Sequence, residues 1–320
     1  MSEDIYFEGD EVDSEDVRGY DFRDEFDFEE MIESYATTGF QATHLYEAIE
    51  LIERMQEEDA KIYLTFTSNI VSSGLRETVA YLAREDLVDV MITTSGSVTE
   101  DVIKTWRPFK MGDWDADEEE LRERGINRLG NIFVESQGYV ELEEYLKEEF
   151  FPEFFEETNI RTATEMTREL GLDNPDGDSF LHNAAVNDIP VYCPALVDAE
   201  IGNFLFFYRQ NKDPEIGIEI IEDYDRLIHE GLNAGKTGLI VLGGGVPKHQ
   251  AIMTNLFRGG ADYAVYVSTG MEGDGSLTGA PPQEAVSWGK IKKGERNYAQ
   301  VQAEATLVFP LIVAAAFKRN

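Results

Sequence analysis

The chain has 320 residues, 42% of them hydrophobic, which is enough to bury a sizeable core in one large domain or two smaller ones. Its 64 acidic and 27 basic residues give a formal charge of -37, so nucleic acid and anionic membranes would repel it. A densely acidic composition with few lysines is typical of a protein that works in concentrated salt, because screening there shortens the reach of self-repulsion.

Cysteine and histidine provide no sign of a metal site. Cys193 is the only cysteine, so an intrachain disulfide is impossible, and its apolar surroundings indicate a core residue. The four histidines have no metal-binding spacing. No signal peptide is visible, and no apolar run reaches the roughly eighteen residues of a membrane span. We therefore expect a cytoplasmic protein without a metal.

Residues 1–33 are predicted to form an acidic N-terminal extension. Their composition favours a mobile tail, although the aromatic residues among them could instead dock on the body or on a neighbouring subunit. We expect residues 34–320 to form a single domain. Its first helix follows residues 38–43, because Leu45, Ile49, Ile52 and Met55 repeat at helical spacing.

From residue 61 onward a short apolar strand repeatedly ends in small or polar residues, and most of these ends lead into a helix. The predicted strands are residues 62–67, 88–92, 189–196, 238–242 and 261–267. Such alternation predicts an α/β fold, a doubly wound, mostly parallel sheet with helices on both faces (Rossmann-like). The acidic stretch at about 108–164, which contains Trp114, breaks the pattern and is expected to be a peripheral insertion.

The predicted strand ends concentrate hydroxyl-bearing and glycine residues. In parallel sheets the crevice outside the carboxyl ends binds ligands, so we expect a site along that edge. Thr99 is a candidate N-cap for a helix through Lys104. The triple glycine at 243–245 would let a backbone approach a pyrophosphate, although such turns also have purely structural uses. The G-x-G-x-x-G fingerprint is absent.

Residues 284–291 (EAVSWGKI) contain a candidate nucleophile, Lys290. A lysine amine reacts when it is unprotonated, and burial beside Trp288 would lower its pKa. The alternative is a surface lysine that lays its stem on an aromatic ring. His249, close behind the triple glycine, could carry protons near neutral pH, or it could be structural.

Seven blocks, in this order, resemble the deoxyhypusine synthase family. They are residues 38–43 (TGFQAT), 67–78 (TSNIVSSGLRET), 88–104 (VDVMITTSGSVTEDVIK), 189–198 (IPVYCPALVD), 243–249 (GGGVPKH), 260–266 (GADYAVY) and 284–291 (EAVSWGKI). The resemblance runs from about residue 36 to the C-terminus and indicates an archaeal, halophilic member. It implies an enzyme that uses NAD to move an aminobutyl group from spermidine, through a lysine imine, to one lysine of the translation factor 5A precursor. It also implies a homotetramer with sites at subunit interfaces.

The resemblance assigns roles residue by residue. Lys290 matches the imine-forming lysine, and His249 is the second catalytic candidate. The positions matched to NAD contacts are Ser68, Asn69, Ser72, Thr94, Ser95, Gly96, Glu100, Asp198, Gly244, Thr269, Gly270 and Asp274. The positions matched to the polyamine site are Glu100, Asn203, His249, Glu284 and Trp288.

Three positions depart from the family pattern, because Thr99, Asn203 and Leu277 stand where the family usually has acids. Each buried ammonium needs a partner, so the donor could be differently charged, such as agmatine, unless neighbouring acids compensate. Two other readings stay open. One is a homospermidine synthase-like transfer of the aminobutyl group to a small diamine, and the other is a non-catalytic NAD-binding paralogue.

Overall fold

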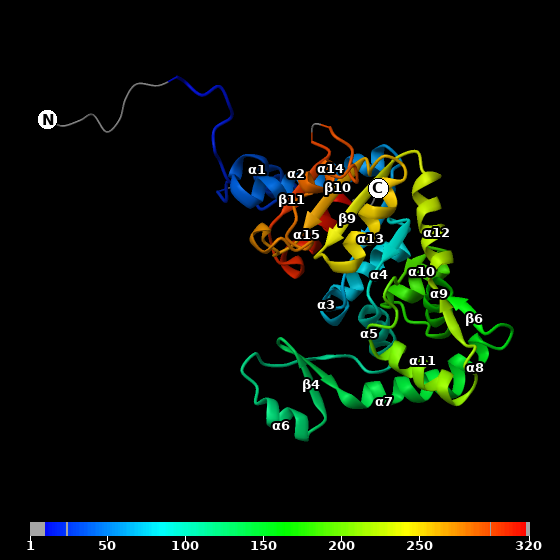
Figure 1. The fold of residues 1–320 in the computed structure, drawn as a ribbon. Coiled ribbons are helices and arrows are strands. Elements are labelled where there is room, and N and C mark those ends of the chain that lie inside the picture. The colour runs from blue at the N-terminus through cyan, green and yellow to red at the C-terminus, as the bar shows by residue number, and fades with distance from the viewer. Residues whose placement is uncertain (1–9, 24, 295, 318–320) are drawn as a thin grey trace.

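The computed structural model describes residues 10–23, 25–294 and 296–317 (Figure 1). Its centre is a six-stranded sheet in the order β7-β2-β1-β9-β10-β11, and every neighbouring pair is parallel. The strands are β1 (Lys61–Thr65), β2 (Val90–Ile92), β7 (Val191–Tyr192), β9 (Thr237–Leu242), β10 (Tyr263–Val267) and β11 (Tyr298–Val301). The strand order reverses between β1 and β9, which defines a switch point in a doubly wound sheet. The predicted fold class is confirmed.

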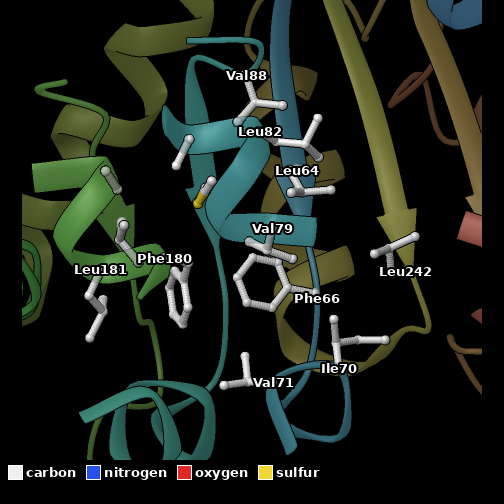
Figure 2. Packing of buried hydrophobic residues seen from close by; sticks show 14 of the residues in the cluster. Leu64, Phe66, Ile70, Val71, Val79, Leu82, Val88, Phe180, Leu181 and Leu242 are labelled. Atoms are coloured by element: carbon white, nitrogen blue, oxygen red, sulfur yellow. The ribbon is translucent and has the colours of Figure 1, made fainter. Parts of the chain in front are cut away.

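Helices cover both faces of this sheet. On β1, Ile62 and Leu64 face one hydrophobic cluster and Tyr63 faces the other, as the alternation of a strand requires. The first cluster is covered by α2 (Phe40–Glu57), α4 (Arg76–Arg84) and α15 (Ala305–Ala316). The second is covered by α12 (Ile220–Leu232), α13 (Gly245–Leu256) and α14 (Pro282–Ser287). Figure 2 shows the first cluster, where Val79 and Leu82 of α4 pack beside Leu64.

Further helices lie at the carboxyl ends of the strands and along the β7 edge of the sheet. At the carboxyl ends of β1 and β2 lie α3 (Ser68–Ser72) and α5 (Ser95–Trp106), and the 3-10 turn Glu272–Asp274 follows β10. Beside β7 lie α9 (Ala163–Asp173), α10 (Phe180–Val186) and α11 (Glu200–Asn211). Thr99 was predicted to cap α5, and this was wrong, because the helix begins at Ser95 and its N-cap is Thr94. Several consecutive small polar residues compete for that cap.

The N-terminal stretch reaches the body through helix α1 (Phe28–Thr38), which crosses the boundary expected at residue 33. Asp27 caps it by accepting a hydrogen bond from the Glu30 amide at 3.0 Å. The amide of Arg18 donates to the Thr37 carbonyl at 3.0 Å. The four apolar residues predicted for the next helix are all buried in α2. Residues 1–9 lie outside the described part of the extension.

The expected insertion folds into an arm and a helical segment. Its elements are β3 (Lys110–Met111), α6 (Glu118–Glu123), β4 (Ile126–Leu129), β5 (Ile132–Glu135), α7 (Ser136–Tyr145), the π-helix Leu146–Phe150, α8 (Phe151–Phe154) and β6 (Ile160–Thr162), which pairs with β8 (Gly217–Glu219). Strands β3, β5 and β4 form an antiparallel sheet, and Figure 1 shows β4 and α6 projecting from the body. Helix α7 packs closely on α5, since a Cβ at Gly138 would lie 2.8 Å from Ile103 Cγ2.

Buried polar groups join the helices around α5. The Arg76 guanidinium donates to Asp101 Oδ1 at 2.6 Å, and the Ser179 hydroxyl donates to the other oxygen of the same carboxylate at 2.5 Å. Asp101 is fully buried, so this carboxylate, which follows a predicted strand end, has a structural role. Cys193 is buried as predicted. Within the described residues, no helix has the length and apolarity that crossing a membrane requires.

Candidate active site

The carboxyl ends of β1 and β2 place two helix N-termini together. Helix α3 begins at Ser68 and helix α5 begins at Ser95. A Cβ added at Gly96 would lie only 2.8 Å from Ser68 Cβ, so the absent side chain lets the two helices meet. The Ser95 hydroxyl is buried and has no hydrogen-bond partner in the described structure. Helix N-termini present free amides to anions, so this corner fits a phosphate group.

The glycine turn after β9 lies at the switch point beside this corner. Gly243 has a φ of +83°, and a Cβ at Gly244 would lie 2.5 Å from Thr278 Oγ1. The Gly245 amide donates to the same hydroxyl at 3.3 Å. Residues 268–281 therefore fold directly over the glycine turn. In doubly wound sheets this edge is where nucleotides bind, so it is the candidate position for a cofactor.

Lys248 fastens this loop and was missed by sequence reasoning. Its side chain is only 2% exposed, and Nζ donates to the carbonyls of Leu277 and Ala280 at 2.7 and 2.8 Å. The ammonium also lies 4.3 Å from the ring centre of Tyr266. Burial lowers the pKa of Lys248 to about 8. The sequence offered no sign of this role beyond the position beside the glycine turn.

Glu100 lies deeper, in the second turn of α5. It is 7% exposed, and the Ser72 hydroxyl donates to its Oε2. Burial raises the pKa of Glu100 to about 7, while the Ser72 hydrogen bond opposes the rise. The side chain of Asn203 is exposed and donates from Nδ2 to Glu200 Oε2 at 3.2 Å. Asn203 therefore orients a carboxylate that the sequence analysis did not single out.

Lys290 lies at the other end of the sheet. Its carbonyl accepts from the Ala261 amide at 2.9 Å, just before β10 begins. Its Nζ is 5.3 Å from the ring centre of Trp288, which is 67% exposed. The aromatic neighbour expected for Lys290 is therefore present, but in a single chain the Trp288 ring is mostly exposed to solvent. Gly289, with a φ of +71°, ends α14 and turns the backbone toward Lys290.

His249, in the first turns of α13, and Glu284, at the start of α14, lie between the glycine turn and Lys290. His249 is on α13, and its pKa is lowered by partial burial and then by the positive charge of Lys290. Glu284 is exposed on α14, close enough for its charge to favour the ammonium of Lys248.

The structure places Glu100 and the backbone of Lys290 far apart in one chain. Strand β10 has five residues, or about 17 Å at ~3.3 Å per residue, and the Lys290 backbone lies beyond its amino end. Glu100 follows β2, which is three strands away from β10. The Lys290 backbone therefore lies away from the carboxyl edge, where the sequence analysis expected a ligand site, because α14 carries the chain back along the sheet. The cavity beside Glu100 has no lining residue from α13 or α14.

The remaining cofactor candidates lie along the carboxyl edge. Asn69, Asp198 and Thr269 are exposed, and the Gly270 amide donates to the Ser268 hydroxyl at 3.0 Å. Asp274 belongs to the 3-10 turn, but its side chain lies outside the described structure. No group of His, Cys, Asp and Glu that could hold a metal ion is found among the described side chains.

A doubly wound α/β protein with a glycine-lined ligand edge is the class that this geometry defines. The deoxyhypusine synthase family model matches residues 30–316. A Halobacterium salinarum protein described as a probable deoxyhypusine synthase is 69% identical over 310 residues, which are 96% of this chain and 94% of the relative. A Pyrococcus furiosus protein with the same description is 43% identical, over 97% of this chain and 96% of its own. The chain belongs to the deoxyhypusine synthase family.

Solved structures agree with this assignment. The crystal structure of an Entamoeba histolytica protein assigned to the same family has a TM-score of 0.68 and 28% identity, over 94% of this chain and 96% of that chain. The ternary complex of AgrE with ornithine and NAD+ is 10% identical, with a TM-score of 0.51, over 87% of this chain and 33% of that chain. At that identity the likeness concerns the fold alone.

Proposed function

We propose that this chain is an NAD-dependent transferase that forms deoxyhypusine on one lysine of the translation factor 5A precursor, in the cytoplasm. Membership of the family supports the aminobutyl transfer. The helix N-termini at Ser68 and Ser95 and the glycine turn after β9, all at the switch point of the sheet, support a dinucleotide as the cofactor. NAD, when bound there, accepts a hydride from the donor amine and later returns it. Spermidine is the default donor and agmatine is the alternative.

The observation that carries this proposal is the setting of Lys290. Its backbone is fixed at both the amide and the carbonyl, its Nζ lies over Trp288, and its charge reaches His249. The Lys290 amine attacks the carbon of the oxidised donor, and the leaving amine departs with a proton that His249 is placed to supply. The imine then passes to the lysine of the factor, which frees Lys290 for another cycle.

A complete site on this proposal needs two copies of the chain. Lys290 lies beyond the amino end of β10, whereas the candidate cofactor residues follow the carboxyl ends of the strands. Trp288 is 67% exposed, so a second surface is required to enclose the amine. This supports a homotetramer with each site at a subunit interface, in which one chain supplies Lys290 and its partner supplies Glu100.

Borohydride trapping tests the proposed function directly. The protein is incubated with NAD and either spermidine or agmatine, reduced, digested and mapped by mass spectrometry. We expect an aminobutyl adduct on Lys290 that requires NAD and a donor. A reaction without NAD, and the Lys290→Arg variant, serve as controls. If no adduct forms with either donor, while the protein still binds NAD, the non-catalytic reading is preferred. Free homospermidine without modified factor would favour the small-diamine reading.

The acidic composition supports work in concentrated salt. With 64 acidic and 27 basic residues, the folded chain repels itself, and dense counterions reduce that repulsion. We expect the melting temperature to rise between 0.1 and 3 M KCl, measured by circular dichroism. A melting temperature that rises as salt is removed would contradict this part of the proposal.

A further inference from the structure

The segment that carries Lys290 has few backbone contacts with the sheet. The Lys290 carbonyl accepts from the Ala261 amide, and the Lys292 amide donates to the Ala261 carbonyl, each at 2.9 Å. These two bonds form an isolated bridge between Ala261 and Ile291, because regular pairing of β10 with β11 begins further along the strand. Among the described side chains, the ring of Trp288 rather than a carboxylate contacts the Lys290 ammonium. The position of the amine therefore depends on how firmly this short stretch of backbone is held.

A buried carboxylate next to the bridge reinforces it. Asp262 Oδ1 accepts a hydrogen bond from Lys292 Nζ at 2.7 Å. Its Oδ2 accepts from the Arg258 guanidinium at 2.6 Å and from the Thr237 amide at 3.0 Å. Burial alone would raise the pKa of Asp262, but the hydrogen bonds from Lys292 and Arg258 lower it below its usual value. The carboxylate is therefore ionised at neutral pH and holds the Lys292 ammonium by a charge-assisted bond.

Arg258 fixes this carboxylate to the rest of the molecule. Its side chain is only 8% exposed, and it donates to the carbonyls of Gly231, Gly235 and Gly260 at 3.0, 2.9 and 3.1 Å. It thus joins the carboxyl end of α12, the loop before β9 and the residue before the bridge. Asp262 is consequently a rigid attachment point rather than a mobile surface acid.

The backbone before β10 is also shaped to receive the Lys290 segment. Gly260 has a φ of +102°, and a Cβ there would lie 2.9 Å from both the Ile291 carbonyl carbon and the Lys292 nitrogen. Only a residue without a side chain lets the two stretches of backbone lie this close. Ile291 itself is 1% exposed in the second hydrophobic cluster. The close approach is an observation independent of the charges.

We propose that Asp262 and Lys292 are positioning residues for the Lys290 amine, because their ion pair fixes the backbone that follows Lys290 to the start of β10. The end of α14 at Gly289 holds the same residue from the other side. The inference rests on the proposed function, since it names residues that hold the proposed nucleophile. Because the Asp262 side chain is 15% exposed, concentrated salt screens this pair less than it screens pairs on the surface.

The test removes the tether and leaves the other bonds to Asp262 in place, in the variant Lys292→Met. Lys61→Met is the matched control, because Lys61 begins β1 at the same end of the sheet and its ion pair with Glu230 is also partly buried. The rate at which the borohydride-trapped adduct appears on Lys290 is measured at saturating NAD, with spermidine and agmatine in turn, in concentrated KCl. Affinity for NAD is measured by fluorescence titration.

We expect Lys292→Met to slow adduct formation about 10-fold, because a small displacement of a nucleophile lowers the rate of its attack. Its affinity for NAD should change less than about twofold, since the tether lies away from the carboxyl edge. Lys292→Arg keeps the charge and should recover most of the rate, and Lys61→Met should trap at the wild-type rate. In an Asp262→Asn background, Lys292→Met should add little, because the pair is already broken.

The outcomes separate this inference from the proposed function. A wild-type trapping rate in Lys292→Met, or equal slowing in Lys61→Met, would overturn the inference and leave the Lys290 chemistry intact. If the wild type forms no adduct with either donor, the proposed function fails, and amide hydrogen exchange then decides the inference. Exchange at the amides of residues 290 and 292 that is about 10-fold faster in Lys292→Met, but not in Lys61→Met, supports the tether. Exchange at the wild-type rate in Lys292→Met overturns it.

Discussion

The regions around Glu100 and Lys290 are built in different ways. Glu100 is enclosed by three helices, is 7% exposed, and is held by Ser72 from a fourth. Lys290 follows a six-residue helix, and its aromatic neighbour Trp288 is 67% exposed. A single chain therefore encloses Glu100 but leaves Trp288, the aromatic neighbour of Lys290, exposed to solvent. On the proposed function, the contrast means that the Lys290 amine is enclosed only in an assembly, whereas the walls around Glu100 are built by the fold of one chain.

Mixed oligomers test this division and carry the largest expected effect. Lys290→Ala removes the nucleophile and should lower activity about a thousand-fold or more. Glu100→Gln should lower it at least about 100-fold, because it removes the buried carboxylate that the proposed function places beside the donor. Co-expression of the two variants should restore roughly a quarter of the wild-type activity, since random pairing of subunits rebuilds one intact site in four.

The matched control is co-expression of Lys290→Ala with Lys290→Arg, which cannot rebuild any site. Activity in this control should stay at the level of the single variants. A mixture of Lys290→Ala and Glu100→Gln that is no more active than this control would show that both residues act within one chain.

Lys248 holds the loop of residues 268–281 over the glycine turn, and its replacement gives the next largest effect. Lys248→Met would leave the carbonyls of Leu277 and Ala280 buried without their donor. We expect a loss of about 2–4 kcal/mol in unfolding free energy and a 10- to 100-fold weaker affinity for NAD, because the loop over the glycine turn loosens. Denaturant unfolding and fluorescence titration with NAD measure these quantities.

Lys248→Arg keeps the charge and the donors and should recover part of the NAD affinity. If Lys248→Met lost stability but bound NAD as tightly as the wild type, Lys248 would be a structural residue without influence on the cofactor edge.

The raised pKa of Glu100 predicts how the free energy of unfolding depends on pH. Burial raises its pKa from 4.5 to about 7, so the folded protein binds this proton more tightly than the unfolded chain does. Stability is therefore lost as pH rises from about 4.5 to about 7, and the full difference is about 3 kcal/mol. Unfolding free energies of the wild type and Glu100→Gln, compared from pH 5 to pH 8 in constant salt, should converge toward low pH. If the unfolding free energies of the two proteins differed by the same amount at every pH, the raised pKa of Glu100 would be contradicted.

Much of the fold followed from local pattern. The spacing of Leu45, Ile49, Ile52 and Met55 predicted the buried face of α2, and all four are buried. Five of the six central strands were predicted to within a few residues. Strand β11 was missed, because Tyr298–Val301 is only four residues long and follows a charged stretch. The order of the strands depends on tertiary pairing, which no local pattern contains.

The candidate site was predictable in residue type but not in arrangement. The strand ends predicted that Ser95 and Gly244 follow β2 and β9 at the carboxyl edge of the sheet, and both residues lie there. The position of Lys290 relative to this edge was not predictable, because a sequence does not show that α14 runs back toward the amino ends of the strands. Glu200 and Glu143 were missed for a different reason. In a chain with 64 acidic residues, only the enclosing helices distinguish the carboxylates that face a cavity.

The smallest expected effect concerns the turn that aims Lys290. Gly289 has a φ of +71°, a conformation that costs a residue with a Cβ about 1–2 kcal/mol. A Cβ there would meet only Leu256 Cδ1 at 3.6 Å, an ordinary contact, so the strain is purely conformational. Gly289→Ala should therefore lower the unfolding free energy by about 1 kcal/mol. It should also slow adduct formation several-fold, because the relaxed turn redirects the Lys290 backbone, whereas the enclosed Glu100 region is unaffected and the affinity for NAD stays unchanged.

Gly177→Ala is the control, since Gly177 lies outside the left-handed region and a Cβ there meets no atom within 4 Å. Equal trapping rates in the two variants would mean that the sheet contact between Ala261 and Ile291, rather than the helix end, fixes the position of the amine.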